Sequence, residues 1–235
     1  MDRYRRYAIY FTAAPGDLAA AGATWLGWDI ARGLAVEQVT FPGIDMSSLT
    51  GRPRKYGFHG TLKAPFRMAE HLSEASLLDD LRAFTGQTGP IPDLDMEVSV
   101  LGRFFALTPT GETIALSKLA SDCVREFDKY RAPMTEAELQ KRRRRKLTPR
   151  QSDLLDRWGY PFVKAEFRFH MTLTGTAPSE QVPRIAQALD SVFGPLLTRG
   201  IAVDAISLCG ERQDGFFEEI ERLPLLGWAQ NPGRR

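Results

Sequence analysis

Two five-residue stretches decide how this chain is interpreted: residues 58–62 read Phe-His-Gly-Thr-Leu and residues 169–173 read Phe-His-Met-Thr-Leu. The pattern Phe-His-x-Thr-Leu thus occurs twice, and it uses two of the three histidines of the chain. Both copies lie in stretches of strand-like composition. Because side chains at positions i and i+2 of a strand share a face, each His is expected to point the same way as its Thr.

The same alternation adds a positive charge to each face. Lys63 lies two residues beyond Thr61, and Arg168 lies two residues before His170. If both strands are regular, each face therefore carries an imidazole, a hydroxyl and a permanent cation. Packing explains why Phe and Leu recur in the two motifs, but it does not explain why His and Thr recur with them.

This set of side chains suits a phosphodiester. Its non-bridging oxygens accept hydrogen bonds from Thr hydroxyls and bind Lys or Arg. Displacement at phosphorus also needs one proton taken from the nucleophile and one given to the leaving oxygen, and two imidazoles with an ordinary pKa of about 6.5 can divide these tasks. If a pseudo-twofold axis relates the two motifs, the imidazoles flank the phosphorus from opposite sides. No cluster of carboxylates accompanies either His to hold a metal ion.

The composition is that of an ordinary globular protein. The chain has 235 residues, is 43% hydrophobic and 26% charged, and carries a net charge of +2, which gives no overall attraction to nucleic acid or membranes. Cys123 and Cys209 form neither a disulfide framework nor a metal-binding spacing. No apolar run approaches the roughly 18 residues of a membrane span, and the basic start lacks the apolar length of a signal peptide. We therefore expect a reduced, soluble, cytoplasmic protein.

The order of elements predicts an α+β fold in a single bilobal domain over residues 1–235. Its expected parts are a strand-rich part with the first motif (1–117), a helical, basic connector (118–160), a second strand-rich part with the second motif (161–230) and a flexible tail (231–235). The expected strands are 7–11, 56–66, 96–101, 104–107, 113–116, 162–174, 201–208 and 216–220, and the expected helices outside the connector are 17–28, 69–84 and 178–193. Strands and helices do not alternate strictly, so an all-parallel sheet is not expected.

With its two motifs, the chain resembles the two-histidine (2H) phosphoesterase superfamily, which is defined by two His-x-Thr/Ser motifs in two similar lobes. The resemblance implies a bilobal, pseudo-twofold α+β fold in which antiparallel-rich sheets surround a central cleft. It also implies cleavage or formation of a phosphodiester, commonly a cyclic one, without a metal or other cofactor. The residues that match the family's catalytic positions are His59, Thr61, His170 and Thr172.

Longer stretches resemble one branch of the superfamily. Residues 56–66 (YGFHGTLKAPF) and 166–175 (EFRFHMTLTG), together with 6–11 and 131–135, are similar to an uncharacterised family assigned to phosphonate metabolism. Genes of that family lie near those of carbon–phosphorus lyase. This neighbourhood implies a phosphorylated ribose 1,2-cyclic phosphate as substrate, which would open to ribose 1,5-bisphosphate. The implication comes from gene context and from no residue of this chain.

A run of basic residues begins at Lys141 and ends at Lys146, and it leaves the rest of the chain net negative. Three interpretations are open. The run is a solvated helix face, an electropositive rim that attracts a phosphorylated sugar and grips its terminal phosphate, or a contact for a nucleic-acid backbone. The chain shows no aromatic RNA-recognition signature around the run, which favours the first two interpretations.

We therefore predict a cyclic phosphodiesterase, a phosphoric diester hydrolase in which one His is the general base and the other the general acid. Thr61 and Thr172 would hold the non-bridging oxygens, Lys63 and Arg168 would stabilise charge, and Tyr56 would contact the substrate at the cleft edge. One alternative is an RNA-end 2′,3′-cyclic phosphodiesterase or a 2′–5′ ligase-type activity. Another is a non-catalytic phosphate- or RNA-binding module that uses the basic run. The near-symmetric motifs do not tell which His acts as base.

Overall fold

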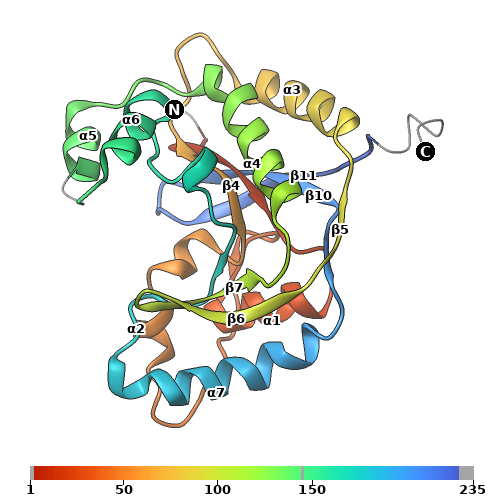
Figure 1. Ribbon diagram of the computed structural model, residues 1–235, viewed down its shortest axis with the longest axis vertical. Coiled ribbons are helices and arrows are strands. Elements are labelled where there is room, and N and C mark those ends of the chain that lie inside the picture. The colour runs from red at the N-terminus through yellow and green to blue at the C-terminus, as the bar shows by residue number, and fades with distance from the viewer. Residues whose placement is uncertain (1–2, 144–145, 228–235) are drawn as a thin grey trace.

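The computed structural model describes residues 3–143 and 146–227, and these residues form an α+β fold (Figure 1). Seven strands make one antiparallel sheet in the order β11-β10-β1-β4-β8-β7-β6. Their bounds are β1 Arg6–Phe11, β4 Gly60–Phe66, β6 Met96–Leu101, β7 Phe104–Pro109, β8 Met171–Thr172, β10 Ala205–Glu211 and β11 Phe217–Pro224. Two small sheets pair β2 Trp28–Asp29 with β3 Leu34–Ala35 and β5 Ile91–Leu94 with β9 Ile201–Val203.

The helices gather at opposite ends of the molecule (Figure 1). They are α1 Asp17–Leu26, α2 Met46–Thr50, α3 Glu74–Gln87, α4 Ile114–Glu126, α5 Glu136–Arg143, α6 Pro149–Trp158 and α7 Val182–Phe193. Helix α3 packs on β10 and β11, α4 packs on β4, and α7 packs on β6 and α1. Short 3₁₀ helices complete the fold: η1 Pro53–Tyr56, η2 Asp128–Tyr130, η3 Lys164–Glu166, η4 Ser179–Gln181 and η5 Gly194–Leu196.

Strand β1 separates two clusters of buried side chains, and every one of its residues after Arg6 is buried. Tyr7, Ile9 and Phe11 belong to the main core, which the helices cover. Because side chains alternate along a strand, Ala8 and Tyr10 point to the other face. There they join a smaller group, which we call the second cluster: Ala8, Tyr10, Trp28, Ile30, Cys209 and Phe217, with Tyr56 and Phe216 packed against it.

Most predicted elements are present, with two clear corrections. The stretch 113–116 was expected to be a strand, but α4 begins at Ile114. Its buried residues Leu116, Leu119, Ala120, Cys123 and Val124 recur at helical spacing, which shows only over the full length of the helix. In the expected strand 162–174, only Met171–Thr172 pairs as β8, and the 3₁₀ helix η3 lies before it.

Other boundaries differ by a few residues. Helix α3 begins at Glu74 rather than at residue 69, because Ser73 caps it in a capping box with Ser76. Helix α1 ends at Leu26, where Gly27 adopts the left-handed conformation that glycine permits. The predicted tail, 231–235, lies outside the described residues. Within 3–143 and 146–227, no helix is long and apolar enough to cross a membrane.

The close contact between α1 and the first motif gives a test of the packing. A Cβ added at Gly22 would overlap the ring of Phe58, the residue before His59. We expect Gly22→Ala to lower the free energy of unfolding by about 1–3 kcal/mol through overpacking. Gly86 in α3 is the matched control, since a Cβ there meets nothing within 4 Å. Gly86→Ala should stabilise the protein by up to about 1 kcal/mol. Urea unfolding measures both, and equal stability of the two variants would contradict the packing described.

Candidate active site

The two motifs meet through the pairing of β4 with β8. Gly60 and Met171 are partners in this antiparallel pair. One residue to either side, the register sets each His opposite the Thr of the other motif: His59 opposite Thr172, and Thr61 opposite His170. All four side chains have the parity opposite to Gly60 and Met171, so they share one face of the sheet. The geometry of an antiparallel pair thus relates the two motifs by a local two-fold rotation.

This register places the two imidazoles on a diagonal across the strand pair. Diagonal neighbours in an antiparallel pair lie about 7–8 Å apart, with their Cβ atoms somewhat closer, whereas directly opposite Cβ atoms lie about 4.5–5.5 Å apart. Each imidazole therefore has the Thr of the other motif directly opposite and the other imidazole at the diagonal position. Electrostatics agrees with this proximity, since a charge on His170 lowers the pKa of His59.

Hydrogen bonds fix the tautomer of His59. Its Nδ1 lies 3.0 Å from the carbonyl oxygen of Gly57, and its Nε2 lies 3.0 Å from Oγ1 of Thr61. A carbonyl oxygen only accepts, so Nδ1 carries the proton and Nε2 accepts from the Thr61 hydroxyl. Gly57 has a φ of 70°, a conformation that favours glycine and that turns its carbonyl toward the ring. Nε2 is therefore the basic nitrogen of His59.

The surroundings of His59 keep it uncharged. Its ring stacks on Tyr10, with centroids 3.8 Å apart and planes at 28°, and Tyr10 is fully buried. Tyr56 lies on another side, with its ring centroid 6.2 Å from that of His59. Desolvation by this burial lowers the pKa of His59 to about 4, against the opposing effect of the Gly57 carbonyl. At neutral pH the imidazole is a base without a proton on Nε2.

His170 repeats the local arrangement of His59 in a more open setting. Its Nδ1 lies 2.8 Å from the carbonyl oxygen of Arg168, again the residue two positions before the His. This bond assigns the proton to Nδ1 in the neutral ring and leaves Nε2 for chemistry. The ring is half-buried, and its nearest aromatic neighbour is Phe104 at 5.9 Å. Thr172 is also half-buried, and Arg168 itself is exposed.

Lys63 does not share the face of His59, because β4 is irregular. Thr61 pairs with Tyr10 of β1, but Lys63 pairs with Ile9, so Leu62 is an extra residue at a β-bulge. Lys63 consequently follows Ile9 to the face covered by α4 and is 3% exposed. Its Nζ lies 3.3 Å from the carbonyl oxygen of Val124 and 3.2 Å from Oδ1 of Asp128. The ammonium group of Lys63, which was expected beside the first motif, instead forms an ion pair that connects η2 to the sheet.

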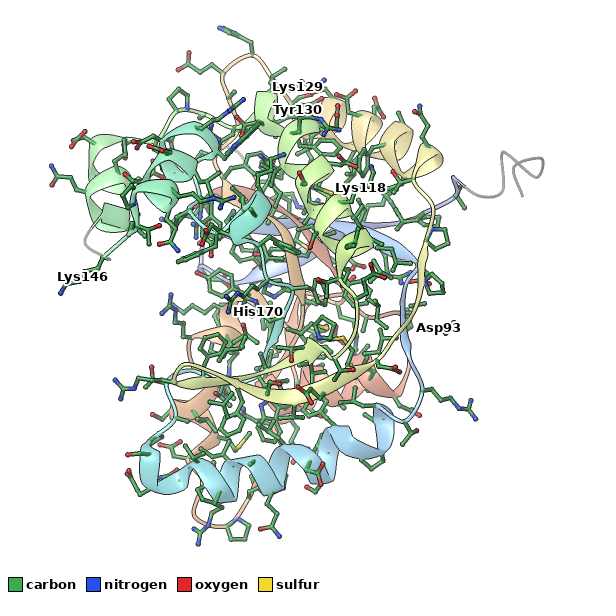
Figure 2. The ribbon with its side chains drawn as sticks, in the orientation of Figure 1. Asp93, Lys118, Lys129, Tyr130, Lys146 and His170 are labelled. Atoms are coloured by element: carbon green, nitrogen blue, oxygen red, sulfur yellow. The ribbon has the colours of Figure 1, made fainter. Side chains whose placement is uncertain are left out.

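The other predicted residues fall in different places. Tyr56 lies at the edge of the site, stacked on Phe217 at 5.3 Å. In the basic run, neither residues 144–145 nor the side chains of residues 141–143 belong to the described part of the chain. Lys146 is exposed and points away from His170 (Figure 2). In the ranges 3–143 and 146–227, no three His, Cys, Asp or Glu side chains are grouped to hold a metal ion.

Sequence reasoning missed Tyr10, whose ring stacks on that of His59. The strand 7–11 was correctly predicted, and alternation alone puts Tyr10 on the face opposite to Ile9. The missing information was the pairing of β1 with β4, because this pairing brings Tyr10 opposite Thr61. Strand β4 begins only at Gly60, far along the chain from β1. An aromatic residue at alternate positions of a strand is common in any core, so no local signal distinguished it.

Comparison with known proteins gives a family and several relatives. Residues 61–218 match the family described as "Protein of unknown function (DUF1045)". The protein "Ribose 1,5-bisphosphate phosphokinase PhnN" of Janthinobacterium sp. (strain Marseille) is 42% identical over 234 residues, covering 96% of this chain and 52% of the relative. The protein of the same name from Laribacter hongkongensis (strain HLHK9) is 32% identical, covering 98% of this chain and 54% of the relative.

The chain thus spans about half the length of the curated relatives that it matches. A solved structure named "Crystal structure of phosphoesterase" is 12% identical with a TM-score of 0.42, over 94% of this chain and 98% of its own. The matched family range begins at Thr61 and includes the whole second motif. By this match the chain belongs to the DUF1045 family, the membership that the sequences around its two motifs predicted.

Proposed function

We propose that the chain is a metal-independent cyclic phosphodiesterase that opens a phosphorylated ribose 1,2-cyclic phosphate. The observation that supports this proposal most is the diagonal pair of imidazoles across β4 and β8, each with a Thr hydroxyl opposite. Both rings hold Nδ1 against a backbone carbonyl and therefore keep Nε2 for proton transfer. Two such groups on either side of one phosphorus supply the base and the acid that ester hydrolysis needs.

The different surroundings of the rings divide the two roles. His59 is neutral at pH 7, so its Nε2 takes a proton from water, and the resulting hydroxide oxygen forms a bond to phosphorus. The P–O bond to the leaving sugar oxygen breaks, and His170, which begins the reaction as an imidazolium with protons on both Nδ1 and Nε2, gives that oxygen the proton from Nε2. One proton is taken up by His59 and one is lost by His170, so exchange with solvent restores the starting state. This assignment gives the ring stacked on Tyr10 the role of base and the ring beside Phe104 the role of acid.

The phosphate oxygens need donors, and the two motifs supply them. Thr61 donates to His59 Nε2 in the free protein, at 3.0 Å. When water takes that position at Nε2, the Thr61 hydroxyl turns to a non-bridging oxygen. Thr172 does the same from β8, and the exposed guanidinium of Arg168 adds positive charge next to the second motif.

The curated relatives support the identity of the sugar. They are named for a phosphokinase that acts on ribose 1,5-bisphosphate, and this chain matches only about half of their length. Opening the 1,2-cyclic ester at the 2-oxygen would produce that bisphosphate. Joining the enzyme that makes a product to the kinase that uses it would account for the two halves of the relatives. This chain has no Walker-type phosphate loop, so we do not propose the kinase activity for it.

Phosphorus NMR in EDTA tests the activity. The purified protein is mixed separately with 5-phosphoribosyl 1,2-cyclic phosphate and with a 2′,3′-cyclic nucleotide. We expect turnover of the ribosyl ester, and we expect His59→Ala and His170→Ala each to lower kcat by about 10²–10⁴-fold. His71→Asn is the control, because His71 is the exposed third histidine and its φ of 66° suits Asn.

The outcomes separate the candidate functions. Full activity in either Ala variant would contradict the two-histidine mechanism. Turnover of the nucleotide alone would keep the mechanism and move the substrate to RNA ends. If neither ester reacts and RNA binds with a strong dependence on salt, the protein is a binding module.

The assignment of His59 as base predicts its titration. Burial lowers the pKa of His59 to about 4, so the ring should stay neutral until the pH falls through that value. A base works only when unprotonated, so the acidic limb of kcat/KM should also lie near pH 4 rather than near the ordinary value of about 6.5. Long-range ¹⁵N–¹H NMR of the three histidines measures the midpoints. A midpoint for His59 above pH 6 would contradict the desolvation of its ring against Tyr10.

A further inference from the structure

The second cluster continues from His59 as a row of aromatic rings that ends at a guanidinium. Tyr56 lies 6.2 Å from His59, and Phe217 stacks on Tyr56 at 5.3 Å with planes at 24°. The guanidinium of Arg6 lies over the ring of Phe217, 5.9 Å from its centroid. Arg6 and Tyr10 are both on β1 and share a face by alternation. Arg6 therefore occupies the end of the row away from His59.

A buried carboxylate holds Arg6 in place. Its Nε lies 2.6 Å and its Nη2 lies 2.9 Å from the two carboxylate oxygens of Glu211. The Glu211 side chain is 10% exposed, whereas that of Arg6 is 30% exposed. Glu211 occupies one edge of the planar guanidinium, and the fork has further donors on its other edge. A guanidinium fixed in this way is preorganised to bind a second anion from the solvent side.

A polar atom without a partner lies inside the same row. The hydroxyl of Tyr10 is buried and has no hydrogen bond within the described residues. Arg6, Glu211 and Tyr56 all lie close enough to affect its ionisation. A buried hydroxyl without a partner is destabilising and requires an explanation. Once the surrounding side chains move apart to admit an anion against Arg6 and Tyr56, this buried hydroxyl can donate to it.

We propose that Arg6, together with Tyr56 and Tyr10, forms a subsite for a second phosphate on the substrate, one sugar away from the reacting ester. This inference rests on the proposed function. The sugar would lie along Tyr56, with its cyclic phosphate between the two imidazoles and its terminal phosphate against Arg6. In this arrangement Arg6 binds the terminal phosphate. The sequence had suggested that role for the basic run 141–146. It defines the substrate class as a small sugar with two phosphorylated ends.

The test compares 5-phosphoribosyl 1,2-cyclic phosphate with ribose 1,2-cyclic phosphate, which lacks the terminal phosphate. The ratio of their kcat/KM values reports recognition of that phosphate. We expect Arg6→Gln to reduce the ratio by about 10- to 100-fold, the loss of one or more charge-assisted hydrogen bonds, mainly through KM. Arg3→Gln is the matched control, since Arg3 lies on the same segment, is 71% exposed and pairs with Glu218. It should leave the ratio unchanged.

Arg6→Gln leaves the buried carboxylate of Glu211 without its partner, which destabilises the fold. A second variant therefore separates loss of the subsite from misfolding. The double variant Arg6→Gln with Glu211→Gln keeps two neutral groups that hydrogen-bond each other, and circular dichroism checks that it is folded. It should show the same loss of preference. If both substrates slow equally in the two variants, or if the ratio does not change, the subsite is overturned.

A binding experiment separates the subsite from the activity. Calorimetry with ribose 5-phosphate measures the affinity for a terminal phosphate without any turnover. If the wild type hydrolyses neither ester, the proposed function has failed, but the subsite still predicts that the double variant binds ribose 5-phosphate at least about tenfold more weakly. Equal binding by the wild type and the double variant would overturn the subsite.

Discussion

The pairing of Gly60 with Met171 is the contact on which the candidate site depends. It joins two segments more than 100 residues apart and makes them neighbours in the middle of the sheet. Glycine is required at this point, because a Cβ at residue 60 would overlap the ring of Phe169. The two Phe side chains that precede the histidines are buried in the main core, which anchors both motifs from behind. The imidazoles and hydroxyls are thereby left on the opposite face.

The symmetry of the motifs ends at the strand pair, and the different surroundings of the two rings support the division of roles that we propose. Each His donates from Nδ1 to the carbonyl two residues earlier, so both rings present the same nitrogen. The ring of Tyr10 stacks on that of His59, and among residues 3–143 and 146–227 no ring stacks on His170 in the same way. His170 is half-buried beside Phe104. Desolvation of the His59 ring lowers its pKa, which supports the role of base that we propose for it.

The sequence alone was sufficient where local patterns carry the information. The repeated motif, the shared face of each His with its Thr and the α+β class follow from residue types and spacing, and the family follows from the resemblance of the sequences around the motifs. The face on which Lys63 lies could not be predicted from the sequence. The extra residue Leu62 moves Lys63 to the opposite face of the sheet, and such a bulge is defined only by the pairing with the partner strand. The same is true of Arg6, whose carboxylate partner lies 205 residues away on β10. Long-range pairing, rather than composition, decides these positions.

The most direct test of the account is a crystal structure of the protein with a slowly hydrolysed phosphorothioate analogue of the cyclic ribosyl ester. The phosphorus should lie between the two rings, with the Nε2 atoms of His59 and His170 on opposite sides of it. Its non-bridging atoms should lie within hydrogen-bond distance of Thr61 and Thr172. A ligand that contacts only one of the histidines, or that binds away from the β4–β8 pair, would contradict it.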